Sequence, residues 1–154
     1  MKDLRLENKV SLLWELFYCH FEYWSVVMIV LTSAIVFTFL IFIVILFQFA
    51  LAAGLPWGEY AMGGKFPGKY PISMRFACIV QIAILAFMGI IVLSKAGLLW
   101  PQWSVFAETA IWFIVAYLVL GTILNLITRS VWERRIWESV TLLMLISSIM
   151  VAMS

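Results

Sequence analysis

The stretch WSVVMIVLTSAIVFTFLIFIVILFQFALAA, residues 24–53, runs for thirty positions without a charged side chain. As an α-helix, which rises ~1.5 Å per residue, it would be about 45 Å long, more than the ~30 Å hydrocarbon core of a bilayer. It is apolar on every face, so it has no polar side to turn towards water. The stretch therefore predicts a transmembrane helix that tilts or extends past the interface.

The composition of the whole chain agrees with this interpretation. Of its 154 residues 66% are hydrophobic and 12% are charged, and the mean hydropathy is +1.10. An ordinary soluble domain is about half apolar and about a quarter charged, so this chain lacks the residues for a polar exterior. Its net charge of +2 is too small for a protein that must neutralise a row of phosphates. We therefore expect membrane lipids, and no nucleic acid, as partners.

Three further apolar runs follow the first. One lies between Arg75 and Lys95, one covers 105–127, and the last begins in the charged segment 133–138 and is apolar from 140 to 153. Lipid cannot satisfy exposed backbone groups, so spanning segments are helices or closed barrels, and the alternation of barrel strands is missing here. The chain is predicted to be all-α, a transmembrane four-helix bundle over residues 24–154 with spans at about 24–53, 76–93, 105–127 and 131–153.

Residues 1–23 have a different pattern. Apolar residues such as Leu13, Leu16 and Phe17 recur at helical spacing opposite Lys9 and Glu15. This pattern is typical of an amphipathic helix that lies in the membrane interface, although a continuation of the first span explains it equally well. The long apolar stretch that follows has no cleavage site of small residues, so we expect it to remain as an anchor.

The connection after the first span is unusual. An even number of spans puts both termini on one side and the connections after spans one and three on the other. The first of these, GLPWGEYAMGGKFPGKYP at 54–71, holds five of the eight glycines, three of the four prolines and four aromatic residues. It is either an ordinary connection with aromatic rings at headgroup level or a loop folded back over the helix ends as a lid. Positive φ is most expected at the adjacent Gly63 and Gly64.

Polar residues within the spans cluster near the same side. Gln48, Gln81 and Asn125 lie at similar depth in three different spans, beneath a group of charged residues. One amide in a span is commonly an interhelical hydrogen bond worth ~0.6 kcal/mol. Three amides at one depth also suit the lining of a wet or ligand-bearing cavity, and both interpretations stay open. The candidate ligand-binding residues are Gln48, Trp57, Glu59, Arg75, Gln81, Asn125, Arg129, Glu133 and Arg134.

Several separated motifs occur in order between residue 52 and the C-terminus: GLPWGEYAMGG, KYPISMR, LSKAG and LNLITRSVWERRIWESV. This pattern resembles a family of small bacterial four-helix integral membrane proteins. The resemblance implies a multi-pass protein of the bacterial inner membrane and brings no activity with it. It places the repeated features of that family at Pro56, Trp57, Gly58, Gly63, Gly64, Arg75, Asn125, Arg129, Ser130, Glu133 and Arg134.

The sequence offers little to catalysis or to metal binding. The single histidine, His20, lies on the opposite side of the membrane from the charged loops in this topology, so it cannot act as their base. Cys19 and Cys78 fall near opposite faces, which excludes a metal pair and an intramolecular disulfide. We expect no cofactor and no metal. An enzyme would have to use Glu59 and Glu133 as its acid and base.

Three functions fit these features. We favour a protein that binds a lipid or small amphiphile beneath the 54–71 loop, with Arg75, Arg129 and Arg134 donating to an anionic headgroup. The alternatives are a homo-oligomeric transporter or channel and an accessory subunit of a larger membrane complex. The two loops carry six basic residues against four on the terminal side, so the positive-inside rule places the loops in the cytoplasm.

Overall fold

The computed structural model describes residues 2–128 and 130–154, with side chains from Trp14 onward except those of Leu16 and Cys19. Over these residues the chain is all-helical and has no strand. Four helices pack together, and each is long and apolar enough to cross a membrane, which confirms the predicted fold class. They are α1 (Lys2–Ala53), α2 (Ile72–Lys95), α3 (Ser104–Ile127) and α4 (Val131–Ala152).

Helices α1 and α2 end in the same glycine-dependent way. At the end of α1 the Gly54 N–H donates to the Leu51 carbonyl and the Leu55 N–H to the Ala50 carbonyl, both at 3.0 Å. Gly54 has φ +90°, a conformation that glycine adopts without a steric penalty. At the end of α2 the Gly97 and Leu98 N–H groups repeat the pattern. The positions of these glycines therefore set where the two helices stop.

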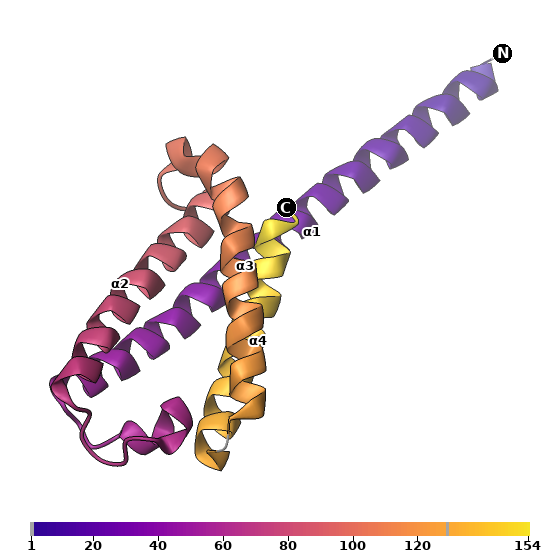
Figure 1. Cartoon of the computed structure of the whole chain (residues 1–154). Helices are drawn as coiled ribbons and strands as arrows, with labels where there is room; N and C mark the ends of the chain where they lie inside the picture. The colour runs from indigo at the N-terminus through magenta and orange to yellow at the C-terminus, as the bar shows by residue number, and fades with distance from the viewer. Residues whose placement is uncertain (1, 129) are drawn as a thin grey trace.

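The connections divide the bundle into two ends. The loop between α1 and α2 and the short turn between α3 and α4 lie together at one end, and the connection between α2 and α3 lies at the other (Figure 1). We call the first the loop end. Helix α1 continues well beyond the other three helices towards the N-terminus (Figure 1). This arrangement matches the predicted alternation of four spans.

The N-terminal part of α1 is continuous with the first span. Every side chain described between Trp14 and Val26 is exposed. The side chains of Lys9, Leu13, Leu16 and Cys19, on which the amphipathic pattern and the cysteine prediction depended, lie outside the described residues. The location of residues 1–23 in the interface therefore stays a prediction.

Two apolar clusters hold the bundle together. The larger one lies along the helices and includes Phe37 of α1, Val92 of α2, Ile111 of α3 and Met144 of α4, all fully or almost fully buried. The smaller cluster lies at the loop end and consists of the buried residues Leu51, Tyr70 and Cys78, with Phe66 packed against them. The second cluster connects the 54–71 loop to the ends of α1 and α2.

Candidate functional site

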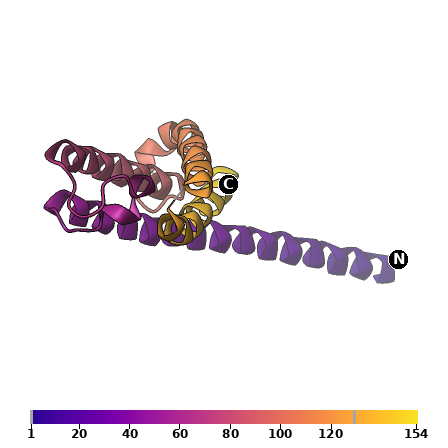
Figure 2. The same cartoon turned by 60° about the horizontal axis from the view of Figure 1, so that its bottom comes forward.

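The 54–71 loop folds back across the loop end of the bundle (Figure 2). The Gly58 N–H donates to the Gly68 carbonyl at 3.0 Å, which closes the loop on itself. A Cβ atom at Gly58 would lie 2.1 Å from the Phe66 carbonyl oxygen, so only glycine fits. Gly63 and Gly64 have φ +69° and +71°, which confirms the positive φ predicted for them.

The backbone of the loop is bound by the first two turns of α4. The Ser130 hydroxyl donates to the Glu59 carbonyl at 3.3 Å, and the Trp137 indole N–H donates to the Tyr60 carbonyl at 2.8 Å. The Gly63 N–H donates to the Glu133 carboxylate. These bonds join residues about seventy positions apart in the sequence. The loop is therefore a cover attached to α4.

Glu133 binds the loop through its side chain. Its side chain is buried, and its Oε2 accepts from both the Gly63 N–H and the Thr128 hydroxyl, the latter at 2.9 Å. It lies in the first turn of α4, where the helix dipole favours a negative charge, and its own N–H donates to the Ser130 hydroxyl at 3.3 Å. One carboxylate thus joins the loop, the end of α3 and the start of α4.

A cavity of about 750 Å³ lies beneath the loop. This volume is within the range of ~300–1,000 Å³ that is usual for small-molecule sites. All four helices and the loop contribute to its walls, so it lies between them at the loop end of the bundle. Its apolar walls include Phe47, Leu85 and Met144. The polar residues of the lining are Gln48, Lys65, Gln81, Tyr117, Asn125, Thr128, Glu133 and Thr141.

Two of the three predicted amides join helices while they line this cavity. The Gln81 amide donates to the Tyr117 hydroxyl, which links α2 to α3. The Asn125 amide donates to the Thr141 hydroxyl at 3.2 Å and to the Trp137 carbonyl at 3.4 Å, which links α3 to α4. The Gln48 amide lines the cavity and forms no hydrogen bond with the residues that the structure describes. The two interpretations of the amides are therefore compatible.

Four of the nine candidate residues lie in the cavity lining, namely Gln48, Gln81, Asn125 and Glu133. Arg129 lies outside the described residues. The remaining four, Trp57, Glu59, Arg75 and Arg134, are placed elsewhere at the loop end.

Those four residues have other surroundings. The Arg75 Nε–H donates to the Tyr70 carbonyl at 3.0 Å, and the guanidinium lies against Gly54. Trp57 stacks on Phe47 with ring centroids 6.2 Å apart, and so supports a cavity wall from behind. Arg134 and Glu59 are exposed. Glu133 and Lys65 are the charged residues of the described lining, which contains no arginine.

Sequence reasoning missed Tyr117, Lys65 and Thr128 as lining residues. Tyr117 is a polar ring in the middle of an apolar span, a signal that was available in the sequence. Lys65 and Thr128 reach the cavity because the loop and the end of α3 fold towards each other, which no local pattern indicates.

Tyr70 attaches the loop to the ends of α1 and α2. Its side chain is 4% exposed, and its hydroxyl has no hydrogen-bond partner among the described residues. Burial raises the pKa of Tyr70 to about 12, and the nearby Cys78 and Glu133 raise it as well. The ring is therefore neutral at physiological pH, and among the described residues it holds the loop by packing.

Comparison of the chain with models of protein families, with curated proteins and with solved structures finds no match. Any function must therefore be argued from the lining of the cavity, its size and its place at one end of an apolar bundle.

Proposed function

We propose that this chain is a multi-pass protein of a bacterial inner membrane that binds a lipid or small amphiphile in the cavity beneath the 54–71 loop. The observation that supports this proposal is the cavity itself, which has a volume of about 750 Å³, is covered by a loop and is lined by residues of four helices. The volume is within the range that is usual for small-molecule sites, so the space suits a bound molecule. The bacterial inner membrane rests on the resemblance of the sequence motifs.

The lining favours a molecule with both polar and apolar parts. Gln48, Asn125 and Thr141 offer neutral donors and acceptors, while Phe47 and Met144 offer apolar surface. A polar group buried here without hydrogen bonds would cost about 1–3 kcal/mol, so the amides and hydroxyls select a head that can pair with them. An amphiphile meets both requirements with one molecule.

The charged residues of the lining indicate which kind of ligand headgroup fits the cavity. Arg75 and Arg134, which the sequence suggested as donors to an anionic head, do not line the cavity. The described charges there are Lys65 and Glu133, and the Glu133 Oε2 is already occupied by Gly63 and Thr128. The third predicted donor, Arg129, lies outside the described residues. From the described lining, we favour a head recognised mainly by neutral hydrogen-bonding groups.

Native mass spectrometry of the protein purified in mild detergent tests this proposal. We expect the wild type to retain one non-detergent adduct at near-stoichiometric level. Gln48→Leu removes the amide that faces the cavity without bonding to the described residues, so this variant should lose most of the adduct. Gln102→Leu makes the same change at an exposed site at the other end of the bundle and should keep it. A wild type without an adduct, or an undiminished adduct on Gln48→Leu, would refute the proposal.

A further inference from the structure

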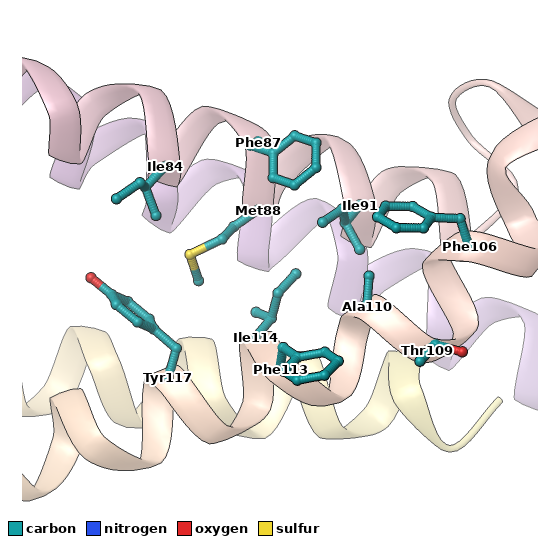
Figure 3. Close-up of a pocket in the computed structure, with 10 residues that line it drawn as sticks. All are labelled: Ile84, Phe87, Met88, Ile91, Phe106, Thr109, Ala110, Phe113, Ile114 and Tyr117. Carbon is teal, nitrogen blue, oxygen red and sulfur yellow. The ribbon is translucent and has the colours of Figure 1, made fainter.

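A second cavity lies between α2 and α3. It has a volume of about 730 Å³ and an almost entirely apolar lining. Figure 3 shows the rings of Phe87, Phe106 and Phe113 bordering this groove from the two helices, with Tyr117 at one end. The residues that line it are Ile84, Phe87, Met88, Ile91, Phe106, Thr109, Ala110, Phe113, Ile114 and Tyr117.

The groove and the cavity beneath the loop meet at Tyr117, which lines both. The Tyr117 hydroxyl accepts a hydrogen bond from the Gln81 amide, which lines the polar cavity. In Figure 3 this hydroxyl points away from the apolar residues of the groove. The two spaces therefore adjoin, and their lining changes from polar to apolar at one residue.

The length of the groove suits a hydrocarbon chain. Phe106 and Tyr117 mark its ends on α3, and 117 − 106 gives 11 residues of helix. At ~1.5 Å per residue this is about 16 Å, close to half of a ~30 Å hydrocarbon core. One acyl chain of a membrane lipid covers about this depth.

The opposite end of the groove lacks a comparable head site. There the cation of Lys95 is paired with Glu108 at 3.6 Å. Of the polar residues that line the groove, Thr109 lies towards that end and Tyr117 at the junction. The Gln48 amide and the other polar groups of the described lining lie at the loop end. A single molecule that fills both spaces would thus have its head at the loop end and its tail in the groove.

We propose, on the basis of the proposed function, that the ligand is an amphiphile with one long hydrocarbon tail. Its tail lies in the α2–α3 groove, its head lies in the cavity beneath the loop, and Gln81 and Tyr117 bind it at the junction. The head carries hydroxyl or carbonyl groups that pair with the amides of the described lining. In this proposal the groove holds the tail of one bound ligand and not the chains of bulk lipid.

Chain-length dependence of binding tests the assignment. The probes are octanoyl, lauroyl and palmitoyl monoacylglycerol, whose head is neutral and carries hydroxyl groups, added to delipidated full-length protein in a bulky-headed detergent. The apparent affinity, taken from the shift in melting temperature, should rise at least about tenfold from the octanoyl to the palmitoyl probe, because longer tails bury more methylene groups. Hexadecane, which has the tail alone, should stabilise the protein far less than the palmitoyl probe.

A pair of matched variants locates the tail. Ala110 is partly buried and lines the groove, whereas Ala116 is exposed on α3 and lines neither cavity. Ala110→Phe fills the groove, so it should abolish the gain with chain length and leave octanoyl binding in place. Ala116→Phe should behave as the wild type does.

The outcomes separate this inference from the proposed function. If Ala110→Phe keeps the full gain with chain length, the tail lies elsewhere and the inference is wrong, although the cavity beneath the loop still has its ligand. The inference is also wrong if hexadecane stabilises the protein as much as the palmitoyl probe does, or if none of the three probes stabilises the wild type. The adduct in native mass spectrometry, and its loss in Gln48→Leu, decides the proposed function independently.

Discussion

Glu133 connects three segments, namely the 54–71 loop, the end of α3 and the start of α4. Its carboxylate accepts hydrogen bonds from Gly63 and Thr128, and the residue is buried at the end of a bundle surrounded by apolar helices. A buried carboxylate without partners would be costly, so these donors are what make its position possible. In return, the carboxylate fixes the loop over the cavity.

The first prediction tests this role. Glu133→Ala leaves the Gly63 N–H and the Thr128 hydroxyl without their acceptor, and should lower the free energy of unfolding by about 1–3 kcal/mol. Glu133→Gln keeps an acceptor oxygen and should lose less. The control is Glu108→Ala, which removes a largely exposed carboxylate paired with Lys95 and should cost at most about 1 kcal/mol. Melting curves in detergent measure all three variants, and equal losses for the two alanine variants would contradict the assignment.

At the scale of elements, the loop 54–71 is as much a folded element as the helices are. It closes on itself between Gly58 and Gly68, packs Tyr70 against α1 and α2, and is bonded along its backbone to α4. Such a loop covers the cavity only while its internal geometry is kept. Its glycines are therefore structural requirements of the cover.

Gly58→Ala is the second prediction. The added Cβ would overlap the Phe66 carbonyl at 2.1 Å and approach the Gly68 carbonyl at 2.9 Å, so the loop has to open. We expect a loss of stability of about 1–3 kcal/mol, faster protease cleavage within 54–71, and loss of the native adduct. Gly89→Ala is the control, since its Cβ would make an ordinary 3.6 Å contact with Ile41 and alanine favours the helix. Unchanged protease cleavage in Gly58→Ala would show that the loop is not closed as described.

The sequence predicted the helices well and the directions of long side chains less well. The spans follow from hydropathy, and the common depth of Gln48, Gln81 and Asn125 follows from the rise of a helix. Hydropathy and helical rise are both local properties of the sequence. The direction of a long side chain depends on tertiary neighbours. Arg75 lies at the loop end, yet its guanidinium turns to the Tyr70 carbonyl and Gly54 instead of the cavity. The bond between Gly63 and Glu133 joins residues 70 apart, and no local pattern indicates it.

The whole molecule has two different ends. The loop end carries the polar cavity and its cover, whereas the end at the α2–α3 connection carries the Lys95–Glu108 pair and the neighbouring rings of Trp100 and Trp103. Large apolar side chains are exposed along the outside of the helices between these ends, as expected of a surface in contact with lipid. The orientation of the protein in the membrane therefore determines on which side of the membrane the covered cavity lies.

The last prediction determines that orientation. Single cysteines replace Lys65 and Arg135 at the loop end and Gln102 at the opposite end, all exposed, in a background without Cys19 and Cys78. Four spans require that positions 65 and 135 share one side and position 102 the other. The six basic residues of the two loops favour the cytoplasm for the loop end, so an impermeant thiol reagent added to intact cells should label only position 102. Labelling of 65 and 135 but not 102 would reverse the orientation and keep the spans. Labelling of 65 and 135 from different sides cannot occur with four spans, and that result would show that one of the four helices does not cross the membrane.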